Sequence, residues 1–135
     1  MGENVEELFS LGISEEDMKN ILEQNSNLFN ISSDLVKEKI DILKYVNCDQ
    51  RHIKNIIVSN PEYLERESSD ILKLIKYLKD NGFTLLNLLF DSNPYFLNYD
   101  VFEIRDYVNK RIDDGLELDD IVDEVENNPY IIDEV

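Results

Sequence analysis

The chain has 135 residues, 42% of them apolar, which is enough for one domain with a sizeable hydrophobic core. Its 30 acidic and 13 basic residues give a net charge of −17, which disfavours non-specific binding to nucleic acid or to an anionic membrane. The single cysteine, Cys48, excludes an intramolecular disulfide, and no apolar run approaches the roughly 18 residues of a membrane span. Because the N-terminus is acidic and has no basic leader segment, we expect either a cytoplasmic protein or a mature chain already processed, with no membrane partner.

An internal repeat organises the sequence. The pattern of Asn-Pro followed by large apolar residues occurs in SNPEYL (59–64), SNPYFL (92–97) and NNPYII (127–132). The three prolines, Pro61, Pro94 and Pro129, lie 33 and 35 residues apart. A second column with nearly the same spacing consists of Gly12, Asn47, Gly82 and Gly115. Apolar columns accompany both, and self-similarity at a fixed period is the signature of a repeat protein.

The first of four units spans residues 5–43 and predicts two helices. Ser14, followed by three acids, marks the start of the first helix, because a short polar side chain caps free amides and acids suit the helix dipole. The second helix is expected to start at 32–34. Its apolar residues Val36, Ile40 and Leu43 follow the i, i+4, i+7 spacing of a half-buried helix.

The second and third units, residues 44–78 and 79–111, repeat this arrangement. Asp49 and Thr84 are the expected caps of their first helices, and the second helices are expected to start at 68–70 and near Asp100. Each first helix should end at Asn-Pro, because proline donates no hydrogen bond and disfavours the helical conformation in the residue before it. The apolar pair after each proline is expected to enter the core.

The fourth unit, residues 112–135, contains a first helix that starts near Leu118 and has no second helix. Each second helix in the earlier units should end at the glycine column, where glycine or asparagine can adopt the left-handed cap conformation. Units of this size bury little surface alone, so stacking must supply a continuous core. We predict an all-α, right-handed or curved α-solenoid of about four two-helix repeats in one domain. The residues with structural roles are Gly12, Asn47, Pro61, Gly82, Pro94, Gly115 and Pro129.

Two segments carry the repeat best, LGISEEDMKNILEQNSNLF (11–29) and VNCDQRHIKNIIVSNPEYL (46–64). The order of the repeat as a whole, which is apolar-Gly-apolar, a capped helix, Asn-Pro and an apolar pair, resembles the mTERF repeat, named for the mitochondrial transcription termination factors. The resemblance covers nearly the whole chain and implies a superhelix of helix pairs that binds nucleic acid in a basic groove. This chain differs from that description, because it has under four full units and is acidic.

The basic residues concentrate in the two central units, which contain ten of the thirteen. Lys19 and Lys54 share one column of the repeat, and Lys44 and Lys79 share another. One interpretation is a basic stripe that contacts a partner or nucleic acid. The alternative is solvated lysines that pair with local acids. The candidate contact residues are Lys19, Lys44, Arg51, Lys54, Lys73 and Lys79.

The fourth unit has ten acids and no base. An EF-hand loop counted back from Gly115 would place ligands at Lys110, Ile112 and Asp114, and two of these three cannot coordinate calcium. We therefore expect no calcium loop, and either a solvated acidic face or one that docks a basic partner. The candidate docking residues are Asp113, Asp114, Glu117, Asp119, Asp120, Asp123 and Glu124.

Catalytic and metal-binding patterns are weak. Cys48 and His52 are four residues apart, but no further Cys or His completes a zinc site. Cys48 falls in an apolar column and is expected in the core, whereas His52 is expected at the surface. The sequence has no phosphate-binding glycine loop and no nucleophile elbow, so we predict neither an enzyme nor a cofactor. Seven tyrosines suggest either helix packing or a protein interface.

Three functions remain open from the sequence. The first is a non-enzymatic repeat module that binds another protein, most simply a basic one. The second is mTERF-like binding of nucleic acid through the central units. The third is an acidic surface that mimics nucleic acid. A monomer or a weak homodimer through the fourth unit is expected, depending on whether Ile121, Val125, Ile131 and Ile132 find partners within the chain.

Overall fold

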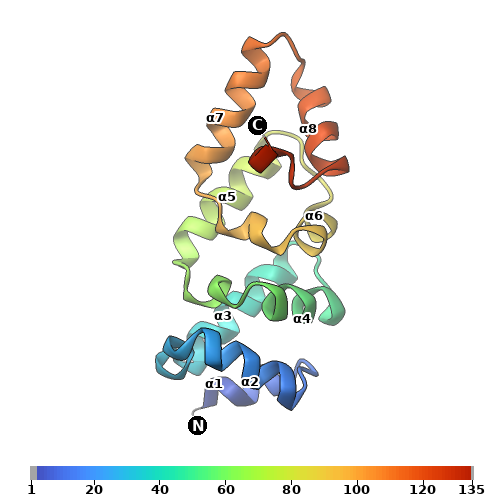
Figure 1. Ribbon diagram of the computed structural model, residues 1–135. Helices are drawn as coiled ribbons and strands as arrows, with labels where there is room; N and C mark the ends of the chain where they lie inside the picture. The colour runs from blue at the N-terminus through green and yellow to red at the C-terminus, as the bar shows by residue number, and fades with distance from the viewer. Residues whose placement is uncertain (1–2, 135) are drawn as a thin grey trace.

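The computed structural model describes residues 3–134, and this part of the chain is helical, with no strand (Figure 1). The elements are α1 (Glu3–Phe9), α2 (Glu15–Gln24), η1 (Ser26–Asn30), α3 (Ser33–Tyr45), α4 (Gln50–Ser59), η2 (Pro61–Glu65), α5 (Ser68–Asp80), α6 (Leu86–Ser92), η3 (Pro94–Asn98), α7 (Val101–Asp113), α8 (Leu118–Asn127) and η4 (Ile131–Glu134), where η marks a 3-10 helix. No helix within residues 3–134 is long and apolar enough to cross a bilayer.

Two rows of helices build an α-solenoid, which confirms the predicted fold class (Figure 1). The helices α1, α3, α5 and α7 pack in sequence to form one row. The helices α2, α4 and α6 form the other, which α8 continues beyond α6. The 3-10 helices η1, η2 and η3 each connect a helix of the second row to one of the first, and η4 follows α8. The helix α1 was not anticipated from the sequence, and it packs on α3 at the start of the first row.

Polar caps start several helices as predicted, whereas α5, α6 and α8 begin without a side-chain cap bond. The hydroxyl oxygen of Ser14 accepts a hydrogen bond from the Asp17 amide at 3.1 Å, and that of Ser32 accepts one from Leu35 at 3.2 Å. The prediction for Thr84 was wrong. The third unit is two residues shorter after its glycine, so Leu85 precedes the first turn of α6 and supplies no side-chain cap.

The glycine column ends the helices of the α3 row in the left-handed conformation, as predicted. Gly82 has a φ of 94°, and Asn47 is the one non-glycine residue with positive φ within residues 3–134, at 69°. The amides of Cys48 and Phe83 then reach back to the carbonyls of Leu43 and Leu78, each at 3.0 Å. These bonds satisfy carbonyls that a helix end otherwise leaves free.

The asparagines of the Asn-Pro pairs join one repeat to the next, a role that the sequence did not reveal. The side-chain amide of Asn60 donates to the carbonyl of Pro94 at 3.0 Å, and that of Asn93 donates to the carbonyl of Pro129 at 2.9 Å. Both asparagines are 1% exposed. Asn-Pro therefore ends a helix and also fixes the spacing between successive units.

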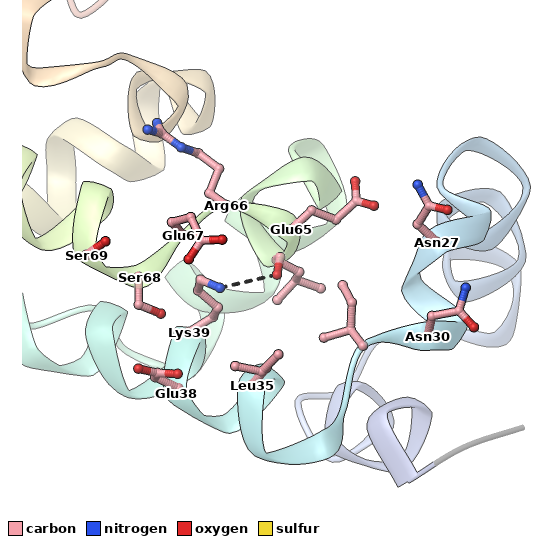
Figure 2. Close-up of a pocket in the computed structure, with 12 residues that line it drawn as sticks. Asn27, Asn30, Leu35, Glu38, Lys39, Glu65, Arg66, Glu67, Ser68 and Ser69 are labelled. Atoms are coloured by element: carbon pink, nitrogen blue, oxygen red, sulfur yellow. Dashed lines mark hydrogen bonds between the residues drawn. The ribbon is translucent and has the colours of Figure 1, made fainter.

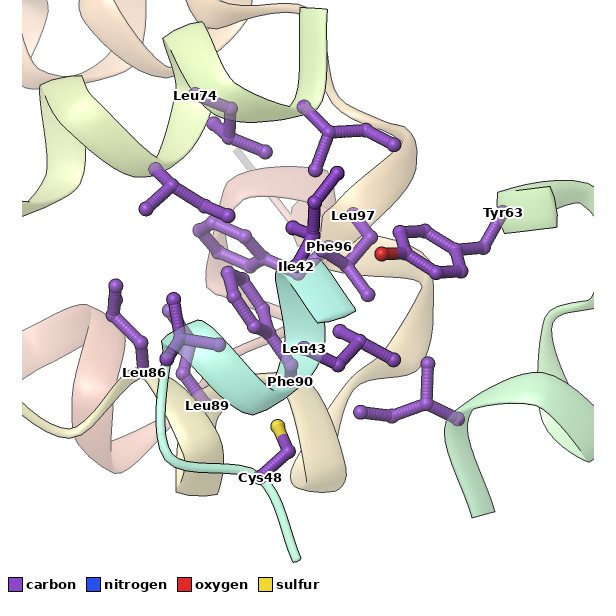
Figure 3. Packing of buried hydrophobic residues seen from close by; sticks show 14 of the residues in the cluster. Ile42, Leu43, Cys48, Tyr63, Leu74, Leu86, Leu89, Phe90, Phe96 and Leu97 are labelled. Carbon is purple, nitrogen blue, oxygen red and sulfur yellow. The ribbon is translucent and has the colours of Figure 1, made fainter. Parts of the chain in front are cut away.

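The core runs along the solenoid between the two rows (Figure 3). The residue pairs after Pro61 and Pro94 are fully buried, as predicted, whereas Ile131 and Ile132 of the fourth unit are half-buried. The rings of Phe90 and Phe96 lie 6.2 Å apart between their centroids. The other labelled members come from α3, α5, α6, η2, η3 and the turn before α4, so one continuous core spans the repeats.

Candidate interaction surfaces

The six candidate basic residues are divided between the two rows of helices. Lys19 lies on α2, and Arg51 and Lys54 lie on α4. The other three belong to the opposite row, where Lys44 lies on α3 and both Lys73 and Lys79 lie on α5. Lys54 is half-buried and the other five are exposed. Neither row contains all six.

Within residues 3–134, none of these six forms an ion pair with a carboxylate at 4.0 Å or less. The Lys79 ammonium lies over the Tyr45 ring, 4.0 Å from its centroid, which is a cation–π contact. Pairing with local acids therefore does not hold these side chains in place, and their positive charges are open to a ligand.

The acidic fourth unit contains two kinds of carboxylate. Asp113, Glu117, Asp119, Asp120 and Asp123 are exposed and form no ion pair within the described residues.

Asp114 and Glu124 instead bond to Arg111 of α7, and Glu124 thereby holds α8 against α7. The Arg111 guanidinium bonds to Asp114 Oδ2 at 3.2 Å, and to Glu124 Oε1 and Oε2 at 3.1 and 3.0 Å. The Tyr107 hydroxyl donates to Glu124 Oε1 at 2.7 Å. Glu124, expected on a docking face, is thus directed into an internal clamp because Arg111 and Tyr107 face it from α7. We call Tyr107, Arg111 and Glu124 the α7–α8 clamp.

The clamp shifts the ionisation of its members. The Arg111 hydrogen bond, and after it the Tyr107 hydrogen bond, lower the pKa of Glu124. Burial, followed by the hydrogen bond to Glu124, raises the pKa of Tyr107 to about 12. At neutral pH, Glu124 is therefore ionised and Tyr107 keeps its proton.

His52 is buried, so its expected surface position was wrong. It occupies the third position of α4, where its amide donates to Asp49 Oδ1 at 2.8 Å and its Nδ1 accepts from the Asp49 amide at 3.3 Å. This reciprocal capping box draws the ring inward. Cys48 lies in the core as expected, where burial raises the pKa of its thiol to about 12. Among the described residues, no group of His, Cys, Asp or Glu is arranged to hold a metal ion.

A polar hollow of about 410 Å³ lies between the start of α3 and the start of α5 (Figure 2). Lys39 is 3% exposed there, and its ammonium donates to the Leu64 carbonyl at 3.3 Å. Burial lowers the pKa of Lys39, and the carboxylates of Glu38 and Glu67 oppose that shift. In the next repeat, the Arg66 guanidinium binds the equivalent carbonyl, that of Leu97. This hollow is therefore a junction between repeats.

Two further hollows, of about 400 and 450 Å³, adjoin between α3 and α5 and share Tyr45 and Leu72. These two side chains are 60% and 43% exposed. Buried Ile42 and Ile75 line the same hollows. We call this surface the α3–α5 groove. Its charged margin consists of Asp34, Lys37, Glu38, Asp41, Lys76, Lys79 and Asp80.

The sequence profile of the mTERF family matches residues 1–90 of the 135. The chain belongs to the mTERF family. Membership places it among helical-repeat proteins of a nucleic-acid-related family whose members are non-enzymatic. A comparison with curated proteins found no match.

The matched region of this mTERF protein contains every candidate basic residue and the whole α3–α5 groove. The acidic fourth unit, residues 112–135, lies beyond it. The two surfaces of opposite charge thus differ also in their relation to the family profile.

Proposed function

We propose that this mTERF protein is a non-enzymatic helical-repeat module that binds another protein, and that its partner is basic. The observation that carries the proposal is the set of exposed, unpaired carboxylates around α8, on a chain whose net charge is −17. Complementary charge steers encounters between proteins and suppresses partners of the wrong sign. A basic protein fits this surface, whereas a phosphate backbone is repelled by it.

The distribution of the basic residues supports the same choice. Nucleic-acid affinity comes chiefly from several phosphate contacts made together along one surface. Here Lys19 and Lys54 lie in one row of helices, while Lys73 and Lys79 lie in the other. Each row therefore offers few positive charges to a phosphate backbone.

Nucleic-acid binding through the central repeats is the second candidate. It is favoured by family membership and by the absence of ion pairs at the six basic residues within the described chain. Their charges would be available to phosphates without first breaking an internal contact.

Fluorescence anisotropy separates the two candidates. Labelled duplex DNA, duplex RNA and single-stranded DNA are each titrated with the full chain at low and then physiological salt. We expect no binding at physiological salt. Tight binding with a steep salt dependence would replace the protein-partner proposal by the second candidate. Two matched triple variants, Lys19/Arg51/Lys54→Gln and Lys44/Lys73/Lys79→Gln, would then show which row makes the contact.

A capture experiment tests the protein partner directly. Immobilised wild type and an Asp119/Asp120/Asp123→Asn variant are exposed to nuclease-treated extract of the source cells, and bound proteins are quantified by mass spectrometry. We expect wild type to retain basic proteins that the variant does not retain. The substitutions remove three negative charges and leave the side-chain sizes nearly constant, so a loss of binding reports on charge. Equal retention by both would refute the role of the acidic unit. Release of a captured protein by duplex DNA would indicate that the acidic unit occupies a nucleic-acid-binding surface.

A further inference from the structure

The α3–α5 groove is an apolar surface with opposite charges at its two ends. We infer that it takes an amphipathic α-helix of the partner protein, with an acidic first turn and a basic last turn, lying antiparallel to α3 and α5. The inference rests on the proposed function, and it names the partner segment that this part of the chain would recognise.

The shape of the groove suits a helix of three to four turns. Its walls, α3 and α5, have 13 residues each, which corresponds to about 20 Å at the rise of an α-helix. The starts of both helices line one hollow, and their ends line another with Tyr45 and Lys79, so the two walls run in the same direction. A helix of about 14 residues matches that length.

The apolar strip of the groove supplies the anchor points. Tyr45 and Leu72 stand exposed where its two hollows meet, beside the buried side chains of Ile42 and Ile75. The Lys79 ammonium holds one face of the Tyr45 ring. Apolar residues at i, i+3, i+4 and i+7 of a partner helix would form a stripe that covers this strip.

The charges that remain after internal pairing give the groove its direction. Lys37 pairs with Glu7 at 3.5 Å, and Lys76 pairs with Asp80 at 2.8 Å. Asp34 and Asp41 form no ion pair within the described residues.

Glu38 lies between these two aspartates in sequence, and its charge acts on the buried Lys39 ammonium as well. Asp34 and Glu38 thus make the first two turns of α3 acidic, whereas Lys79 in the last turn of α5 has no carboxylate partner within the described residues. A partner helix lying antiparallel places a basic last turn at the acidic end and an acidic first turn at Lys79. Those are the charges that helix termini ordinarily favour.

Two synthetic peptides test the inference. Each has about 14 residues and the same leucine stripe; one has glutamates in its first turn and lysines in its last, and the other has these charges exchanged. Each is titrated into the ¹⁵N-labelled full chain, and backbone amide shifts are followed. We expect the first peptide to shift amides of α3 and α5, and the exchanged peptide to bind at least about tenfold more weakly, because like charges would meet at both ends.

Matched variants locate the contact. Tyr45→Ser combined with Leu72→Ser is expected to weaken the first peptide at least about tenfold, since two anchor side chains are removed. Leu88→Ser on α6, which removes a side chain of similar exposure (48%), is expected to change nothing. Circular dichroism of each variant shows whether the helices are retained.

Several results would overturn the inference. These are no shift with either peptide at millimolar concentration, equal affinity for both, or shifts confined to α8. A dimer in light scattering that Tyr45→Ser with Leu72→Ser converts to a monomer would make the groove a contact between two copies. The proposed function is judged separately, because capture lost through Asp119/Asp120/Asp123→Asn does not depend on the groove.

Discussion

The buried asparagine of the second repeat offers the sharpest test of how the units are held together. Asn60 donates to the Pro94 carbonyl at 3.0 Å and to Asn98 Oδ1 at 2.9 Å, and it accepts from Asn98 Nδ2 at 3.1 Å. Asn60→Ala removes all three bonds at a side chain that is 1% exposed. The substitution changes no charge and leaves Pro61 as the residue that stops the helix.

The cost follows from the bonds that are lost. Removing a buried hydrogen-bond partner costs about 1–3 kcal/mol, and the Pro94 carbonyl loses the bond that it accepts from Asn60. The Asn98 side chain is only half-buried and can hydrogen-bond to water instead. The loss of its bonds to Asn60 therefore adds about 0.5–1 kcal/mol. We therefore expect Asn60→Ala to lower the free energy of unfolding by about 1.5–4 kcal/mol, a large share of the about 5–15 kcal/mol typical of a domain.

Urea denaturation followed by circular dichroism measures this loss, and Asn55→Ala is the matched control. The Asn55 side chain also joins α4 to the next repeat, through bonds to the backbone and side chain of Asp91 at 3.1 and 2.9 Å, but it is exposed. Water can replace those bonds, so we expect a loss below about 1 kcal/mol. Equal losses in the two variants would show that burial of the asparagine is not what stabilises the stack.

Three further predictions concern single residues. Asn47→Gly should raise the urea midpoint, because the left-handed backbone there penalises a Cβ atom. Asn47→Ala should lower stability by about 1 kcal/mol, because alanine keeps the Cβ atom and lacks the short polar side chain that lets asparagine adopt this conformation; the reverse order would contradict this account. The pKa of Glu124 is lowered on folding, so its stabilisation is present above its ordinary pKa and is lost as pH falls through the folded value. Denaturation of Glu124→Gln and wild type across acidic pH should therefore show a difference at pH 7 that vanishes in acid, and a constant difference would refute the clamp. The pKa of Tyr107 is raised to about 12, so its stabilisation is complete below about pH 10 and is lost as pH rises through 12. Ultraviolet titration should accordingly show that Tyr107→Phe has one late-ionising tyrosine fewer than wild type. Identical titration curves for the two proteins would contradict the raised pKa of Tyr107.

The parts of the fold that the sequence predicted are those fixed by local backbone chemistry. Pro61 and Pro94 stop helices because of their own rings, and Gly82 and Asn47 cap helices because of their own conformational range. Such residues act within a few positions of themselves, so their spacing along the chain reports the architecture. Thr84 was misjudged because two missing residues shifted the first turn, and column alignment does not reveal which residue then precedes it.

The contacts that the sequence did not predict are long-range. The bond from Asn60 to the Pro94 carbonyl joins residues 34 positions apart, and a backbone acceptor leaves no mark in the sequence. The capping box that buries His52 was within reach of sequence reasoning, because the residue stands three positions after Asp49. Leu72 was also detectable, since it is an apolar residue in a column that contains Lys37 and Arg105.

The bonds between repeats also make the surface more acidic than the composition requires. Lys39 and Arg66 are turned toward backbone carbonyls of the next repeat, and Arg111 is turned into the α7–α8 clamp. These three bases stabilise junctions and are not free to meet a phosphate. The exposed carboxylates around α8 have no such internal partner within the described chain. The hydrogen bonds that join the repeats thus remove positive charge from the exterior. Although the chain has the fold of a nucleic-acid-related family, we propose that its surface is better suited to a basic protein.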